Sequence, residues 1–230
     1  MRMVGFGLVD CYAQITLQDE GKFNPLSLQQ FGEAIDQCLS STQARALILT
    51  GSGKNFSQGL DLESMSRMDA KASGAFVDEC MATLTRLLVF PVPVVTAVNG
   101  HAFGFGAMLV LASDYSVMCE DRGFFCLPEI DLGMGLIPSM NALVTHKLTG
   151  RVLRNLLLTG KRVGGREALE YGIVDACSTE HELLAKARSL PLPMMGKDKK
   201  ALVQLKTGMN GEVLRHCRNT AHSENQLQIG

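Results

Sequence analysis

The feature that most constrains the fold is an uncharged, almost wholly apolar segment, GFGAMLVLAS, at residues 104–113. Its composition is compatible with a helix, and a helix that is apolar all round has to be buried on all sides. It follows PVVTAVNG at residues 93–100, a pattern typical of a buried strand that runs into a turn. The sequence therefore predicts a helix enclosed by other elements.

Strand and helix patterns alternate around this segment. Short apolar or alternating runs predict strands at residues 11–17, 45–50, 115–119 and 124–126, and helical spacing predicts helices after an N-cap at Ser27 and over residues 76–88. From residue 138 onward the pattern is mainly helical. We expect an α/β core at residues 1–175 and a helical C-terminal region at residues 176–230, which would serve oligomerisation or act as a lid.

Composition narrows the classes of function. The 230 residues include 22 Lys and Arg against 23 Asp and Glu, so nothing drives general binding to nucleic acid or an anionic membrane. The seven cysteines form no CxxC pair, which favours reduced thiols and indicates no metal site. Because Arg or Pro interrupts the long apolar stretches, we expect neither secretion nor a membrane span. The predicted location is cytoplasmic, or peroxisomal if a C-terminal signal follows Gly230.

Three segments are placed to carry chemistry. NFSQGLDL at residues 55–62 follows a predicted strand, so the N–H groups of Gly59 and Leu60 are candidates to point into a cleft, although a plain tight loop has the same pattern. The glycine-spaced turn before the apolar helix puts free N–H groups and the positive end of a helix dipole at one spot. In PEIDLG, Glu129 and Asp131 lie between apolar residues, and such surroundings raise the pKa of a carboxyl group, as a general acid/base requires. The alternative is a salt bridge to Arg122.

These segments together resemble the crotonase superfamily, also called the enoyl-CoA hydratase/isomerase family. FSxGxDL, the strand-NGHAxGxG-helix block, PEIDLG and LTGKRVGGREALEYGIVD occur in the family's order and spacing. The resemblance implies a crotonase-like α/β fold of repeated ββα units and an acyl-CoA thioester as substrate. It implies no metal, flavin or nicotinamide, because CoA arrives as part of the substrate. It also implies a homotrimer or a hexamer.

The resemblance assigns an oxyanion hole made of main-chain groups. In the family, two N–H groups hold the thioester carbonyl, and by position these belong to Leu60, after Gly59, and Phe105, after Gly104. Each such donor stabilises a developing oxyanion by about 3 kcal/mol. The family commonly has glycine where this chain has Phe105, so a positive φ there would strain the backbone.

The carboxylates distinguish the possible reactions. Hydratases of the family use two glutamates, one on the buried helix and one in the segment that reads PEIDLG here. In this chain the helix position is Met108, whereas the other position keeps its glutamate, Glu129. One base suffices for a Δ3,Δ2-enoyl-CoA isomerase, which moves a proton from C2 of a 3-enoyl thioester to C4. We therefore expect an isomerase. The alternatives are an enoyl-CoA hydratase or acyl-CoA hydrolase that uses Glu129 alone, and a catalytically silent acyl-CoA-binding protein.

The remaining candidates surround this centre. An apolar wall for the acyl chain is expected from Phe105, Met108, Met134 and Leu136, with plain core packing as the alternative. Lys22 and Arg67 are candidates to contact the CoA nucleotide, although each is also typical of a solvated charge. Asp131 is expected to be structural, and His101 to be a surface or capping residue rather than a donor behind the site.

Overall fold

A computed structural model describes residues 2–220, with side chains through residue 217. Within that range the largest sheet has six strands in the order β1-β2-β4-β7-β9-β11. β1 and β2 are antiparallel and all later neighbours are parallel. The strands are β1 Val4–Val9, β2 Tyr12–Leu17, β4 Ala46–Gly51, β7 Val94–Val98, β9 Tyr115–Cys119 and β11 Ala176–Ser178.

Three strands of the large sheet are each followed by a short strand of a second sheet. β5 (Asn55–Ser57) follows β4, β8 (His101–Phe103) follows β7, and β10 (Phe125–Cys126) follows β9. These short strands pair in parallel in the order β10-β8-β5. A further parallel pair joins β3 (Lys22–Phe23) to β6 (Gly59–Leu60). Two strands followed by a helix recur along the chain, which confirms the predicted ββα units.

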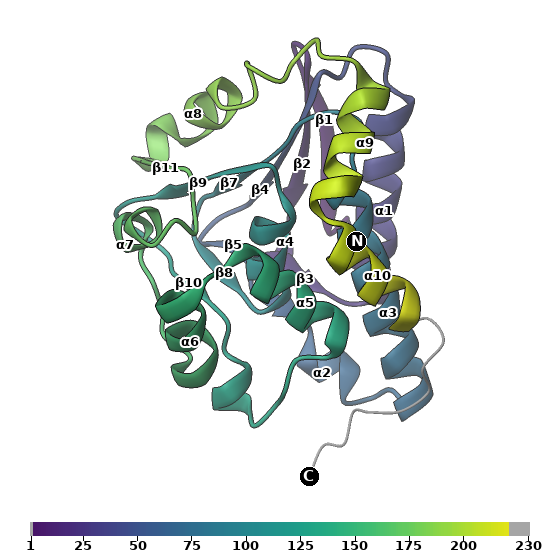
Figure 1. Cartoon of the computed structure of the whole chain (residues 1–230), viewed down its shortest axis with the longest axis vertical. Coiled ribbons are helices and arrows are strands. Elements are labelled where there is room, and N and C mark those ends of the chain that lie inside the picture. Colours follow the sequence, from purple (N-terminus) through teal and green to yellow (C-terminus); the bar gives the residue numbers. More distant parts are fainter. Residues whose placement is uncertain (1, 221–230) are drawn as a thin grey trace.

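The apolar segment forms the central helix, α4 (Phe105–Ala112), and all eight of its residues are buried. Figure 1 shows α4 in the middle of the molecule, and α3 and α5 pack against it. The other helices are α1 Pro25–Ser40, α2 Leu62–Met65, α3 Ala70–Leu88, α5 Pro138–Lys147, α6 Gly150–Thr159, α7 Gly165–Glu170, α8 Leu183–Ser189, α9 Lys199–Met209 and α10 Gly211–Thr220. Short 3-10 turns are η1 Asp19–Gly21, η2 Glu129–Leu132 and η3 Glu180–Glu182.

The large sheet is buried on both faces around its centre. Along β4, Leu47 and Leu49 belong to the main core with α1, α3 and α4, whereas Ile48 belongs to a smaller cluster under α8. Parallel strands covered on both faces are expected to be continuously apolar, and RALILT is such a run. The sheet therefore lies between two helical layers, and α4 lies within the thicker one.

The predicted strands are confirmed to within a residue or two, but the predicted N-cap of the first helix is wrong. The cap is Asn24, and the helix begins at Pro25. Asn24 Oδ1 accepts a hydrogen bond from the Ser27 N–H at 3.0 Å, while Ser27 Oγ accepts one from the Asn24 N–H at 2.9 Å. Ser27 is thus the third helical residue of a capping box, and Pro25 occupies the first position, which needs no N–H donor.

The C-terminal helices are tied to the sheet by a buried cation. Lys206 in α9 is 3% exposed, and its ammonium donates to the Phe90 carbonyl at 3.0 Å and to Asp114 Oδ2 at 2.5 Å. β11 lies just past the predicted boundary at residue 175 and pairs with β9. The proposed division into two regions stays a prediction, and residues 221–230 of the second region lie outside the described residues.

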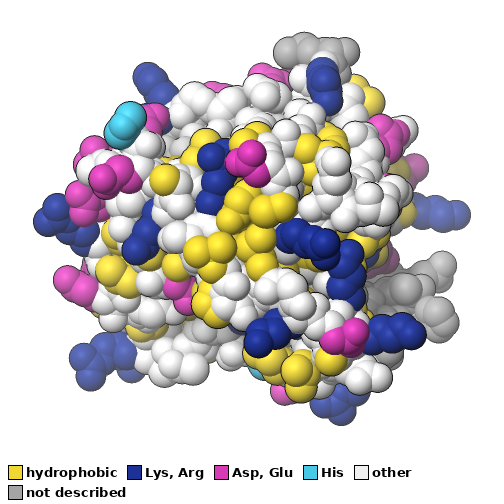
Figure 2. Space-filling view, turned by 90° about the horizontal axis from the view of Figure 1, so that it is seen from above, with side chains coloured by type: hydrophobic (Ala, Val, Ile, Leu, Met, Phe, Trp, Pro, Cys, Tyr) yellow, Lys and Arg dark blue, Asp and Glu magenta, His cyan; other side chains and the backbone are white. Residues whose placement is uncertain are grey.

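The molecular surface mixes residue types. On the face in Figure 2, hydrophobic side chains gather near the centre, and Lys and Arg side chains are interspersed with Asp and Glu. None of the helices within residues 2–220 combines the length and the apolar composition that crossing a bilayer requires.

Candidate active site

The segment that contains β5 and β6 contacts the start of α4 through Gly59, the first residue of β6. Its φ is +85°, and a Cβ there would lie 2.6 Å from the Phe103 carbonyl oxygen and 3.1 Å from the Phe105 nitrogen. Only glycine adopts this conformation without strain and also leaves room for the opposing backbone. The two glycine-bearing segments that the sequence singled out are therefore in direct contact.

The side chain of Ser57 stabilises this segment through two hydrogen bonds. Its fully buried hydroxyl donates to the Gly21 carbonyl at 2.6 Å and accepts from the Gly59 N–H at 3.1 Å. Gly106 of α4 packs so closely that a Cβ there would lie 2.6 Å from the Ser57 carbonyl oxygen. Sequence reasoning assigned no role to Ser57, although it stands in the FSxGxDL motif.

The N–H of Leu60 points away from strand β3. Leu60 is opposite Phe23 in the parallel pair, and the neighbouring Asp61 N–H donates to the Phe23 carbonyl at 2.8 Å. Because successive N–H groups along a strand point to opposite sides, the Leu60 N–H is left for another acceptor. The structure thus agrees with the direction that a donor from this loop requires.

The N–H of Phe105 lies in the first turn of α4, where the helix itself supplies no acceptor. The first helical bond runs from the Met108 N–H to the Gly104 carbonyl at 3.0 Å. Gly104 is the N-cap, and it carries the positive φ of +51°. The strain expected at Phe105 is therefore absent, because the unusual backbone conformation falls on the preceding glycine.

Glu129, a half-buried residue, places its carboxylate beside this helix start. A Cβ on Gly104 would lie 3.6 Å from Glu129 Oε1, and Oε2 is buried with no hydrogen-bond partner in the described part of the chain. Burial raises the pKa of Glu129 above its ordinary value. Arg122 pairs instead with Glu180 at 2.5 Å, so the alternative of a salt bridge from Arg122 to Glu129 is wrong.

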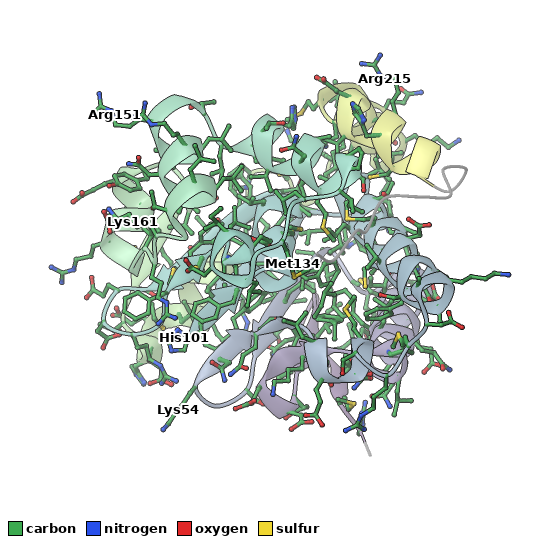
Figure 3. All side chains as sticks on the ribbon, turned by 90° about the horizontal axis from the view of Figure 1, so that it is seen from below. Lys54, His101, Met134, Arg151, Lys161 and Arg215 are labelled. Carbon is green, nitrogen blue, oxygen red and sulfur yellow. The ribbon has the colours of Figure 1, made fainter. Side chains whose placement is uncertain are left out.

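The candidates for the apolar wall divide into two groups. Phe105 and Met108 are 2% and 1% exposed and belong to the main core. Both side chains therefore pack in the core, which was the alternative to a wall for the acyl chain. Met134 and Leu136 are half-buried, and the Met134 N–H donates to the Glu129 carbonyl at 2.9 Å. In Figure 3 Met134 lies near the middle of the view, whereas Arg151 and Arg215 lie at the periphery. Met134 is thus the wall candidate most directly connected to Glu129.

Both basic candidates for the CoA nucleotide form surface ion pairs. Lys22 pairs with Glu20 at 3.1 Å, and its backbone is opposite Gly59 in the β3-β6 pair. Arg67 pairs with Glu63 at 2.5 Å, with both side chains more than two-thirds exposed. The pairing of β3 with β6 therefore places the backbone of Lys22 beside Gly59. Contact between Lys22 and CoA stays a prediction.

His101, expected to be a surface or capping residue, is half-buried and packs against aromatic rings. Its ring lies 5.0 Å from that of Phe103 and 5.6 Å from that of Phe124 between centroids. Burial, followed by the charges of Arg162 and Arg122, lowers the pKa of His101. Figure 3 shows His101 on the same side of the molecule as Lys54. This arrangement favours a neutral imidazole at position 101.

Asp131 lies away from the acid/base position. Its carboxylate packs against Gly160, the residue that ends α6 with a φ of +59°. This contact supports the structural role expected for Asp131. Within residues 2–220, no group of three or more His, Cys, Asp or Glu side chains is arranged to hold a metal ion.

Comparisons with known proteins agree with this geometry. The family model described as enoyl-CoA hydratase/isomerase matches residues 10–229. The chain is 37% identical over 169 residues to enoyl-CoA delta isomerase 3 of Arabidopsis thaliana, covering 71% of each chain. It is 31% identical over 236 residues to carnitinyl-CoA dehydratase of Escherichia coli K12, covering 94% of this chain and 88% of that protein.

Solved structures show the same fold. A probable enoyl-CoA hydratase from Mycobacterium tuberculosis superposes with a TM-score of 0.88 at 24% identity, covering 95% of this chain and 93% of that one. An enoyl-CoA hydratase from Mycobacterium ulcerans gives a TM-score of 0.87 at 25% identity, covering 95% and 96%. With the ββα units, the contacting glycine loops and the match over nearly the whole chain, the protein belongs to the enoyl-CoA hydratase/isomerase family and has its crotonase fold.

Proposed function

We propose that the protein is a Δ3,Δ2-enoyl-CoA isomerase. One observation carries the proposal: Glu129 lies beside the start of α4 with its Oε2 buried and without a hydrogen-bond partner in the described residues, while the helix position that holds a second glutamate in the family's hydratases is Met108, buried in the core. A thioether cannot carry a proton. A reaction that needs one proton carrier therefore suits this site better than one that needs two.

The oxyanion is held by backbone. The N–H groups of Leu60 and Phe105 bind the thioester carbonyl of the acyl-CoA and stabilise the negative charge that develops when a proton leaves C2. The positive end of α4 adds to this effect. Gly59 permits the close approach of the two segments, and Gly104 gives the turn that directs the Phe105 N–H out of the helix.

Glu129 moves the proton. Its ionised carboxylate removes a proton from C2, the electrons delocalise into the dienolate, and the resulting carboxylic acid returns a proton at C4. The double bond is then between C2 and C3, and Glu129 is regenerated as carboxylate. Burial favours the neutral acid between the two steps. Met134 and Leu136 exclude the water that would quench the dienolate.

Water chemistry at the same site is the second candidate. The match to carnitinyl-CoA dehydratase covers 94% of this chain, more than the match to the isomerases does. A dehydratase or hydratase would need Glu129 to activate or release water alone. Met108 favours isomerisation over this alternative, because a thioether buried in the core cannot act as the second acid/base group for water.

Products decide between these candidates. Purified protein is incubated separately with a 3-enoyl-CoA and with a 2-enoyl-CoA, and the products are identified by mass spectrometry after chromatography. Isomerisation gives a 2-enoyl product of unchanged mass from the first substrate, and no product one water heavier from the second. Hydration of the 2-enoyl-CoA, hydrolysis to free CoA, or failure to convert either substrate would each overturn the isomerase proposal.

Assembly and location extend the proposal. We propose a homotrimer or a dimer of trimers, with the C-terminal helices α8 to α10 contributing contacts; sedimentation equilibrium giving a monomer at micromolar concentration would contradict it.

We also propose a cytoplasmic location, with the peroxisome as the alternative. Enoyl-CoA delta isomerase 2 of Arabidopsis thaliana, 35% identical over 175 residues, is named as peroxisomal.

A further inference from the structure

Phe23 contacts both halves of the proposed oxyanion hole. Its backbone belongs to β3, opposite Leu60 of β6, and its carbonyl accepts the Asp61 N–H at 2.8 Å. Its side chain, 1% exposed, extends in the other direction to the first residue of α4. One residue thereby joins two segments that lie 45 positions apart in sequence, at Leu60 and Phe105.

The contact with α4 is between aromatic rings. The Phe23 and Phe105 rings meet edge to face, with centroids 5.0 Å apart and an interplanar angle of 77°. Phe31 of α1 also meets the Phe23 ring edge to face, at 5.5 Å and 84°. Edge-to-face contacts are directional because the positive edge of one ring faces the negative face of the other. The Phe105 side chain is therefore held in one orientation relative to β3.

Phe23 is itself held firmly on the chain. The next residue, Asn24, forms the capping box of α1 with Ser27, and Ser27 Oγ also donates to the Lys22 carbonyl at 2.9 Å. Hydrogen bonds thus fix the backbone on both sides of Phe23. A displacement of its ring would have to move β3 or the start of α1.

We propose that Phe23 is a positioning residue that sets the spacing between the Leu60 and Phe105 N–H groups. This proposal rests on the proposed oxyanion hole. Its backbone places the first donor through the β3-β6 pair, and its ring places the second through Phe105. A glycine at position 105 would have no ring for Phe23 to contact. The phenylalanine, unusual for the family, gives this chain a side-chain link between the two donors.

The test measures the bound carbonyl directly. Octanoyl-CoA labelled at its carbonyl carbon is bound to the wild-type protein and to Phe23→Leu, and the carbonyl stretching frequency is recorded by infrared difference spectroscopy. Hydrogen bonds from an oxyanion hole lower that frequency. This saturated probe has no double bond to move, so the readout is independent of isomerisation. We expect Phe23→Leu to lose at least half of the wild-type downshift, and kcat on 3-enoyl-CoA to fall by about 10-fold to 100-fold with KM nearly unchanged.

Matched variants separate positioning from general destabilisation. Phe90→Leu removes a ring of the same size from the same core, at 2% exposure and outside this contact chain, so it should lower the melting temperature and leave the carbonyl frequency unchanged. Phe105→Leu removes the same ring contact from the other side and serves if Phe23→Leu does not fold. The double variant, with both Phe23→Leu and Phe105→Leu, should lose little more of the carbonyl downshift than either single variant, because both substitutions break the same ring contact.

Two outcomes would overturn the proposal. One is a wild-type downshift that Phe23→Leu and Phe105→Leu both retain. The other is a loss of the same size in Phe90→Leu, which would make the effect one of stability. A wild-type downshift that Phe23→Leu loses and Phe90→Leu keeps, without any isomerisation by the wild-type protein, would contradict the proposed reaction and leave the positioning role of Phe23 supported.

Discussion

The carboxylate of Glu129 and the backbone of Gly104 are neighbours: a Cβ on Gly104 would stand 3.6 Å from Glu129 Oε1. Two opposing effects act on the carboxylate there. Burial favours the neutral form, whereas a hydrogen bond from the backbone N–H of Glu129 itself favours the charged form. Burial is the larger effect, because the pKa of Glu129 is raised.

Gly104→Ala should impair catalysis through the backbone rather than through a clash. The conformation at Gly104, with φ +51° and ψ -116°, lies outside the regions open to other residues, and the substitution should cost about 1 to 3 kcal/mol. The new methyl group would be in ordinary contact with Glu129. We expect kcat to fall by at least about tenfold as the Phe105 N–H turns.

Urea unfolding and kcat should be measured for Gly104→Ala beside Gly74→Ala. Gly74 is inside α3 with open space around it. Alanine should stabilise that helix by about 0.5 to 1 kcal/mol without changing kcat. Unaltered kcat in Gly104→Ala would show that the turn at α4 does not direct the donor.

Glu129→Gln should abolish most of the isomerase activity. The amide keeps the size of the side chain but offers no basic oxygen, so kcat on a 3-enoyl-CoA should fall by about 100-fold to 10,000-fold. Acyl-CoA binding, measured by calorimetry, should be largely retained. Asp131→Asn is the control and should keep its activity. Turnover of Glu129→Gln within a few-fold of wild type would exclude Glu129 as the base and make Asp131 the next candidate.

Glu129 should also make folding stability depend on pH. Its pKa is raised in the folded state, so the folded protein binds a proton that the unfolded chain releases. This contribution is fully present below the ordinary glutamate pKa and is lost as pH rises through the raised value. Urea unfolding at about pH 5 and about pH 8 should therefore show wild type losing stability relative to Glu129→Gln as pH rises. A constant difference would mean that burial does not perturb this carboxyl.

Lys206→Met should destabilise the protein strongly. The substitution leaves Asp114, whose side chain is 18% exposed, without its cation and the Phe90 carbonyl without its donor. Breaking one partner of a buried pair costs about 3 to 5 kcal/mol, which urea unfolding will measure. Lys200→Met, at an exposed position in the same helix, should change stability by less than about 0.5 kcal/mol. Equal stabilities for the two variants would show that the pair does not tie α9 to the sheet.

Leu60→Pro tests the first oxyanion donor. Proline removes the N–H, and loss of one such donor costs about 100-fold to 1,000-fold in kcat. Leu60→Ala keeps the N–H and should retain most of the activity. Circular dichroism melting establishes whether each variant is folded. A folded Leu60→Pro protein with normal turnover would remove Leu60 from the oxyanion hole.

Sequence patterns predicted the buried parts of the fold well and its edges poorly. The run ALIL at residues 46–49 and the segment GFGAMLVLAS are almost wholly apolar, so burial alone indicates what they become. β1, with sequence VGFGLV, was not predicted, because it is an edge strand whose form depends on pairing with β2. β8 was not separated from the turn that includes His101, since a strand of three residues has too few positions to show a period.

The candidate site was predictable where backbone dominates. The sequence motifs indicated Gly59 and Gly104. Both residues have a positive φ, and at Gly59 the opposing backbone also leaves no room for a Cβ. The direction of a side chain was not predictable. Phe105 was expected beside the acyl chain, but its ring turns into the core toward Phe23, because a partner 82 positions earlier in sequence lies there.

The complete enclosure of α4 determines how the site withstands heat. A helix with no face toward solvent cannot melt alone, so hydrogen exchange at its amides must wait for the whole molecule to open. The dipoles that meet the substrate are therefore oriented once, when the chain folds, and do not need to be reoriented at each turnover. Warming should leave catalysis intact until the cooperative unfolding transition and then abolish it together with the fold.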